Sequence, residues 1–182
     1  MKNIQILAVV VTHNRRMLLS RCLDNLLAQT RQPGQILVVN NASSDGTAEM
    51  LEQRGIPFIT QENLGSAGGW HRGIQHAMDN RFDAVWLMDD DGFPDVDALG
   101  VLEAALLPDI ACAASIVVRE DIPTDFVFDL PVLNMSDLPV IWGRTRKLGT
   151  MSELRVAAPG GTYPFAHFFN GALISMTAVR EV

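Results

Sequence analysis

Three consecutive aspartates, Asp89, Asp90 and Asp91, are the side chains best suited to chemistry in this 182-residue chain. They follow the apolar run 84–88, which predicts a buried strand, and they precede a Gly-Phe-Pro turn at 92–94. Adjacent carboxylates repel one another unless a positive charge lies among them. Mg²⁺ or Mn²⁺ can supply that charge, because both ions bind protein carboxylates and diphosphate oxygens together. The run therefore predicts a metal–diphosphate site, with a solvated turn or helix N-cap as the alternative.

Alternating strand and helix patterns predict how these carboxylates are positioned. Apolar runs predict strands, and three- and four-residue spacing of apolar side chains predicts helices between them. The predicted strands are 4–11, 36–39, 56–60, 84–88 and 110–118, and the predicted helices end near 27, 54, 80 and 107. This order is typical of an α/β fold with a doubly wound, mostly parallel sheet flanked by helices. Ligands bind such sheets beyond the carboxyl ends of the strands, where the polar loops lie.

The regular alternation is lost beyond Arg119, where prolines recur. We interpret residues 120–162 as an insertion-like excursion on the sheet and not as a second domain. An apolar stretch returns at 172–176, without an obvious terminal helix. The length suits one domain, so we expect a single domain over residues 1–182.

Composition narrows the kinds of molecule that the protein could bind and the compartment in which it could act. A formal net charge of -7 argues against nucleic acid. The two cysteines are far apart and predict core thiols, not a disulfide framework. No apolar run reaches the roughly 18 residues of a transmembrane span, and the N-terminus lacks a signal-peptide layout. We therefore expect a cytoplasmic protein without a transmembrane segment.

Two further polar loops follow predicted strands and could contact a ligand. The loop from Thr12 to Arg15 can offer backbone groups to a base and a guanidinium to a diphosphate. The loop that carries Asn41 and Asp45 can bond a pyrimidine edge or a ribose hydroxyl. Each has an ordinary alternative: Arg15 as a solvated residue at a helix N-terminus, and Asp45 as a helix cap.

A glycine-rich loop at 63–69 precedes a helix that carries Arg72. Glycines let a backbone approach a ligand closely, and a helix N-terminus favours anions. The segment matches neither the G-x-G-x-x-G nor the Walker pattern, so a dinucleotide fold or P-loop is not supported. Tight packing of helix on strand is an equally good explanation of Gly68 and Gly69.

Taken together, the loops resemble family 2 glycosyltransferases, which have a GT-A fold and use nucleotide-diphosphate sugars. The resemblance covers nearly the whole chain and is strongest with the rhamnosyl- and galactofuranosyl-transferase branch. It rests on VVVTHNR at 9–15, VNNASSDGT at 39–47, NLGSAGG at 63–69, RG at 72–73, WLMDDD at 86–91 and FNGA at 169–172.

The resemblance implies roles for individual residues. Those implied to bind the nucleotide sugar are Thr12, Asn14, Arg15, Asn41, Asp45, Gly68, Arg72, Asp89 and Asp90. Asp89 and Asp91 are implied to bind Mg²⁺ or Mn²⁺ as the outer members of an Asp-x-Asp motif. Asn41 stands where many relatives place an aspartate against uracil, so uridine or thymidine is expected, with guanosine as an alternative.

The resemblance also implies the reaction. It implies metal-dependent hexosyl or pentosyl transfer, with inversion, from a UDP- or dTDP-sugar to a glycan or lipid-linked acceptor in cell-envelope polysaccharide biosynthesis. Residues 1–118 would form the nucleotide-sugar half and 119–182 the start of the acceptor side, with peripheral association at the inner membrane face allowed. The catalytic base is expected beyond Val182, in a domain truncated at its C-terminus. The alternatives are a non-catalytic nucleotide-sugar-binding domain and, with less support, a nucleotidyltransferase.

Overall fold

The computed structural model describes residues 4–106, 110–134, 137, 139, 147–168 and 170–180. Along these residues the elements are β1 (Ile6–Thr12), α1 (Arg16–Leu27), β2 (Gln35–Asn41), α2 (Thr47–Arg54), β3 (Phe58–Gln61), α3 (Gly65–Asp79), β4 (Ala84–Asp89), α4 (Ala98–Ala105), β5 (Cys112–Ala114), β6 (Asp125–Pro131), β7 (Lys147–Thr150), α5 (Met151–Ala157), β8 (Ala172–Ser175) and α6 (Met176–Arg180). The chain forms two compact units, unit 1 (residues 1–115 with 168–182) and unit 2 (residues 116–167). No helix within the described residues has the length and apolar character needed to cross a membrane.

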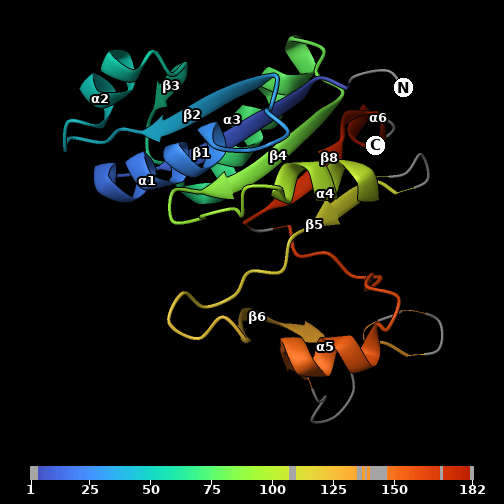
Figure 1. Ribbon diagram of the computed structural model, residues 1–182. Coiled ribbons are helices and arrows are strands. Elements are labelled where there is room, and N and C mark those ends of the chain that lie inside the picture. Colours follow the sequence, from blue (N-terminus) through green and yellow to red (C-terminus); the bar gives the residue numbers. More distant parts are fainter. Residues whose placement is uncertain are drawn as a thin grey trace. The chain divides into compact units, whose positions relative to one another are not determined.

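Unit 1 is built on a six-stranded sheet with the strand order β3-β2-β1-β4-β8-β5 (Figure 1). The strands β1 to β4 run parallel, and β8 runs antiparallel to both of its neighbours, β4 and β5. All seven residues of β1 are buried, as a central strand covered on both faces requires. The predicted mostly parallel sheet flanked by helices is therefore confirmed.

Two apolar clusters lie on opposite faces of this sheet, because alternate residues of a strand point to opposite sides. On one face, α1, α2 and α4 pack against a set of strand residues that includes Ile6, Ala8 and Val10. On the other face, α3 and α6 pack against the alternate set, which includes Leu7 and Val9. The strand ends are thus held between two helical layers, which fixes the loops that follow them.

The helix α3 begins earlier than the sequence indicates. The predicted glycine-rich loop to Gly69 is wrong, since the helix already begins at Gly65. A Cβ added at Gly69 would lie 2.4 Å from Val11 Cγ1, and one at Gly73 would lie 2.4 Å from Val9 Cγ1. These two glycines therefore let α3 approach β1 closely, and that packing outweighs the low helix propensity of glycine.

The later part of unit 1 also departs from the predictions. The strand predicted over 110–118 is only the short β5, and residues 116–118 already belong to unit 2. The apolar stretch at 172–176 divides into β8 and the short helix α6, which was not predicted. The helix α4 ends at Ala105, and the predicted end at 107 lies outside the described residues. Strand β8 comes from a distant segment, and local periodicity carries no information about such a pairing.

Unit 2 contains a two-stranded antiparallel sheet of β6 and β7 with the helix α5. Its buried core consists of Phe126, Leu130 and Leu148. The sequence predicted no regular element here, yet α5 has a recognisable N-terminal signal. Thr150 Oγ1 accepts the N–H of Glu153 at 3.3 Å, and Glu153 Oε2 accepts the N–H of Gly149 at 2.9 Å. This resembles a Thr-x-x-Glu capping box, which sequence analysis could have found.

Candidate functional site

The ends of β1 and β4 bring together two segments that are 75 or more residues apart in sequence. The parallel register pairs Val11 with Asp89, so Thr12 lies beside the aspartate run. Thr12 Oγ1 donates a hydrogen bond of 2.7 Å to Asp90 Oδ2, and both residues are buried. The middle aspartate therefore points into the protein and ties β1 to the turn after β4.

Arg15 supplies the positive charge that the sequence analysis required among the carboxylates. Its Nη1 lies 3.2 Å from Asp90 Oδ1 and 3.2 Å from Asp91 Oδ2. The charge of Asp90, more than that of Asp91, raises the pKa of Arg15. The side chain of Asp90 is 4% exposed, whereas those of Asp91 and Arg15 are 46% and 53% exposed. Asp91 and Arg15 are therefore accessible to a ligand, and Asp90 is not.

The first aspartate of the run is half-buried, near Ser66 at the start of α3. Burial raises the pKa of Asp89, the Ser66 hydroxyl opposes that shift, and the charges of Asp91 and Asp90 add to it. Burial likewise raises the pKa of Asp90, against the lowering effect of Thr12 and Arg15. Negative charge at this edge is thus incompletely compensated by the protein.

Asn170 is a site residue that the predicted set omitted, although it lies in the FNGA segment. Its Oδ1 accepts the backbone N–H of Asp89 at 2.5 Å, and its Nδ2 donates to Asp91 Oδ1 at 3.3 Å. The turn is also held from α1, where Arg21 stacks over the Phe93 ring at 3.8 Å from its centroid. The sequence signal for Asn170 is its place in the motif, since no spacing connects residues 79 positions apart.

The loop after β2 is bound to the loop after β1. Asn14 adopts a left-handed conformation with φ of 53°. Its backbone N–H donates to Ser43 Oγ at 2.9 Å, and its Oδ1 accepts the N–H of Ser44 at 2.7 Å. The side chain of Asn14 is thus used to join the two loops, a role that the predicted nucleotide contact did not include.

Asp45 joins the first turns of two helices. Its Oδ2 accepts the N–H of Arg16 at 2.8 Å, and its Oδ1 accepts the N–H of Thr47 at 3.2 Å and the Thr47 hydroxyl at 2.6 Å. Burial acts to raise the pKa of Asp45, but the hydrogen bonds from Thr47 and Arg16 outweigh it and hold the pKa below its ordinary value. The N-cap positions themselves are Arg15 in α1 and Gly46 in α2, so Asp45 performs the function of a cap from the residue before Gly46.

Asn41 lies below the surface, with 2% of its area exposed. Its Nδ2 donates to Gly65 O at 3.1 Å, and its Oδ1 accepts from Gln61 Nε2 at 2.9 Å. These bonds connect the end of β2 to the end of β3 and to the start of α3. A contact from this amide to a nucleobase would have to replace or share one of them.

The two remaining predicted residues lie on α3. Gly68 is in the first turn, where an added Cβ would lie 2.3 Å from Leu64 Cβ. Arg72 is two turns into the helix because α3 begins at Gly65 and not after Gly69. Arg72 is exposed, and no described residue forms an ion pair or hydrogen bond with it. Its guanidinium is therefore available to an anionic ligand.

The donor atoms suit a divalent ion that is completed by its ligand. Within the described residues, no three His, Cys, Asp or Glu side chains gather as a cage for a metal. Mg²⁺ in nucleotide sites commonly takes one or two carboxylates and fills its remaining positions with phosphate and water. Asp89 and Asp91 offer such a pair, and an ion bound there would share the Asp91 carboxylate with the Arg15 guanidinium. The residues present thus fit a cation that arrives with a diphosphate.

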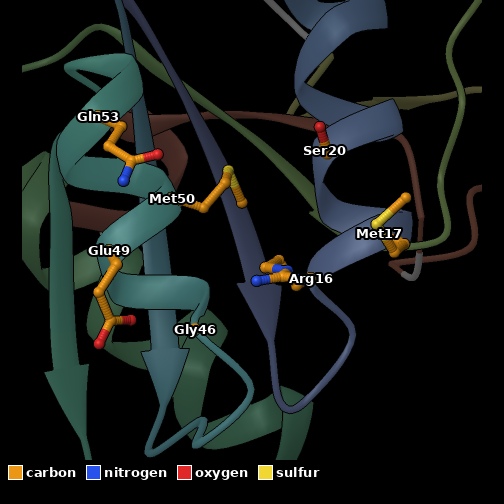
Figure 2. A pocket seen from close by; sticks show the side chains of 7 residues that line it. All are labelled: Arg16, Met17, Ser20, Gly46, Glu49, Met50 and Gln53. Carbon is orange, nitrogen blue, oxygen red and sulfur yellow. The ribbon is translucent and has the colours of Figure 1, made fainter.

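A cavity of about 430 Å³ lies elsewhere, between α1 and α2 (Figure 2). It is lined by Arg16, Met17, Ser20, Gly46, Glu49, Met50 and Gln53. None of these lining residues belongs to the predicted site. The two helices cover the sheet face opposite α3, so the cavity does not face Arg72.

Comparison with known proteins identifies the architecture. The family model described as glycosyl transferase family 2 matches residues 7–173. The chain belongs to this family. Family membership and the mostly parallel sheet together make the fold GT-A, as the resemblance of the loops to this family implied.

Among relatives, the chain is 35% identical over 182 residues to the galactofuranosyltransferase GlfT1 of Mycolicibacterium smegmatis. The match covers 96% of this chain and 57% of that protein, so the family 2 chain spans a little over half the length of this relative. A second GlfT1, from Mycobacterium tuberculosis, is also 35% identical, over 97% of this chain and 57% of that protein.

Among solved structures, the mannosyltransferase PcManGT from Pyrobaculum calidifontis, in complex with GDP-Man and Mn²⁺, is similar with a TM-score of 0.55 and 24% identity. That match covers 65% of this chain and 37% of the other. The Staphylococcus aureus protein TarS, residues 1-349, is similar with a TM-score of 0.61 and 14% identity, over 97% of this chain and 48% of that one. These similarities concern the fold.

Proposed function

We propose that this chain binds a nucleotide-diphosphate sugar and belongs to an enzyme that transfers the sugar to a glycan or lipid-linked acceptor. The observation that carries the proposal is the cluster of Thr12, Arg15 and the aspartates 89–91 at the carboxyl ends of β1 and β4. In an open α/β sheet this edge is where ligands bind. Membership of glycosyl transferase family 2 supplies the reaction class.

Within this proposal, Asp89 and Asp91 would hold Mg²⁺ or Mn²⁺. The ion, when bound, would neutralise negative charge on the diphosphate leaving group. The Mn²⁺ named with PcManGT is consistent with this assignment. Arg15 keeps its bond to buried Asp90 and turns its exposed side to a phosphate, and Arg72 approaches the diphosphate from α3. Both cations would stabilise charge that grows as the sugar leaves.

The donor and stereochemistry are part of the same proposal. An acceptor hydroxyl would give its proton to a general base and bond to the anomeric carbon on the face opposite the diphosphate. The bond from that carbon to the diphosphate oxygen would break at the same time, so the configuration of the carbon would be inverted. A UDP- or dTDP-sugar is proposed as donor, with Asn41 as a support of the base pocket, since its amide is occupied by Gln61 and Gly65. The name of the GlfT1 relatives makes galactofuranosyl transfer the first specific activity to assay.

Calorimetric titration with UDP, dTDP and GDP, each with and without Mn²⁺, tests the proposal. We expect one diphosphate to bind more tightly when Mn²⁺ is present, and Asp91→Ala to remove that gain. Asp95→Ala, which changes an exposed carboxylate four residues away, serves as the matched control and should bind like the wild type. Absence of binding to all three diphosphates would refute the donor site. Binding without turnover of the cognate sugar donor would favour the non-catalytic alternative.

A further inference from the structure

Asn170 lies opposite Asp89 because of the pairing of β4 with β8. In this antiparallel pair, Leu87 lies opposite Ala172, and the N–H of Gly171 donates to Leu87 O at 2.9 Å. Asn170 lies in the turn just before β8, two residues from Ala172, and its Oδ1 reaches the N–H of Asp89. The pairing of β4 with β8 therefore brings the turn that carries the asparagine close to the end of β4.

The two bonds of the Asn170 amide fix its orientation. The backbone N–H of Asp89 can only donate, so it must meet the amide oxygen, at 2.5 Å. The ionised carboxylate of Asp91 can only accept, so it must meet the amide nitrogen, at 3.3 Å. One side chain with both a donor and an acceptor therefore holds the backbone of the first aspartate and the carboxylate of the third.

Glycine at position 92 makes room for this amide. A Cβ added at Gly92 would lie 2.9 Å from Asn170 Oδ1, closer than ordinary packing allows. The turn that carries the aspartates thus lacks a side chain where the asparagine enters it. Replacing Gly92 by alanine would displace the amide without changing the asparagine itself.

Asn170 also stands next to the point where the chain leaves and re-enters unit 1. Ser115, the last residue before unit 2, donates its N–H to Gly171 O at 3.2 Å. Gly171 has a φ of 89°, and a Cβ there would lie 3.0 Å from Ser115 Cβ. A hydrogen bond thus joins the segments of unit 1 that precede and follow unit 2, one residue away from the asparagine.

We propose that Asn170 is a positioning residue that pre-arranges Asp89 and Asp91 for the cation of the donor complex, an inference that rests on the proposed function. Arg15 holds Asp91 Oδ2 and Asn170 holds Asp91 Oδ1, so both oxygens of this exposed carboxylate are oriented before a ligand arrives. Removing a residue that orients a metal-binding side chain lowers the affinity for the metal about 10- to 100-fold.

The test measures Mn²⁺-enhanced diphosphate binding in Asn170→Ala and Gly92→Ala. The probe is UDP, or whichever of UDP, dTDP and GDP the wild-type chain binds, titrated by calorimetry with and without Mn²⁺. We expect the metal-free affinity for the diphosphate to be unchanged and the gain from Mn²⁺ to fall by about tenfold or more in Asn170→Ala. The gain in affinity from Mn²⁺ should also be smaller in Gly92→Ala. The control Asn80→Ala removes one hydrogen bond, from the side-chain amide to His76 O at the end of α3. It should retain the full gain in affinity from Mn²⁺.

Each outcome decides between distinct conclusions. Full retention of the Mn²⁺ gain by a folded Asn170→Ala variant, or by Gly92→Ala if the first variant does not fold, would overturn the positioning role. Equal losses with and without Mn²⁺ would also overturn it, because they would indicate general disruption of the site. If the wild type shows no Mn²⁺-dependent binding, the proposed function fails and this inference fails with it.

Discussion

Two polar loops leave the same edge of the unit 1 sheet, one after β2 and one after β4. They differ in how many of their polar side-chain atoms are already hydrogen-bonded within the protein. At the end of β2, Asn41 bonds Gln61 and Gly65, and in the loop that follows, Asp45 bonds the first turns of α1 and α2. After β4, the Asp91 side chain remains 46% exposed, and within the described residues its contacts are with Arg15 and Asn170.

This difference indicates a division of labour between loops of similar composition. The β2 loop is rich in Asn, Ser and Asp, and those side chains satisfy backbone groups at helix starts and turns. The β4 turn combines one buried carboxylate with others that are only partly compensated. Residue type alone predicted ligand contacts in both loops, whereas the bonding pattern favours the β4 turn as the place where a ligand is held.

The largest expected effect is on ligand binding, which a substitution in the β4 turn should weaken and one in the β2 loop should not. Asp91→Ala should weaken Mn²⁺-dependent diphosphate binding by about 100-fold or more, since it removes a proposed metal ligand and not merely its support. Its thermal unfolding temperature should stay near that of the wild type, because the side chain is half exposed. Calorimetry and thermal unfolding of Asp91→Ala and Asp45→Ala together check this. Equal binding losses in the two variants would remove the distinction.

A smaller effect should divide the β4 turn itself into a buried and an accessible part. Thr12→Val keeps the side-chain shape but leaves Asp90 Oδ2 without its 2.7 Å donor. A buried carboxylate oxygen without a partner should lower the free energy of unfolding by about 1–3 kcal/mol. Urea denaturation measures it, and Thr30→Val, which removes an exposed hydroxyl bonded to Val96 O, should change little.

The role of Asp45 predicts a loss of stability without a loss of binding. Asp45→Ala should reduce the free energy of unfolding by about 1 kcal/mol, the usual effect of losing a helix cap. The folded-state pKa of Asp45 lies below its unfolded value. Its stabilisation is therefore present above the unfolded value and is lost as pH falls through the folded pKa.

The pH series is the sharper part of that measurement. The difference in unfolding free energy between wild type and Asp45→Ala should be constant above about pH 5 and shrink below about pH 4. Asp89 and Asp90 titrate in both proteins, so their contributions cancel in the difference. A difference that grows on acidification would contradict the capping role.

The smallest effect concerns the bond between the β1 and β2 loops. Ser43→Ala removes the acceptor of the Asn14 N–H in a solvent-exposed position. Water can replace that acceptor, so the free energy of unfolding should fall by about 0.5 kcal/mol or less. Denaturation curves with replicate errors below that value are needed, and a loss as large as that of Asp45→Ala would mean that the loops are more strongly coupled than the contacts indicate.

Much of the fold follows from local sequence pattern. The apolar runs predicted β1, β2 and β4 within a few residues, and the spacing of leucines predicted α1. The pattern failed where packing overrides propensity, as at Gly65–Gly69, whose glycines lie inside α3 because β1 approaches closely. It also failed in unit 2, where short strands and a small core leave little periodicity to detect.

The sequence by itself determined the family, the succession of strands β1 to β4 along the chain, and the placement of three aspartates where β4 ends. Only the tertiary structure decided that Asp90 points inward to Thr12 while Asp91 faces solvent, and that β8 lies between β4 and β5. It alone brought Asn170 to the aspartates from 79 residues away. Periodicity records which face of an element is apolar, but the partner of each polar side chain depends on strand pairing between segments that are remote in the chain.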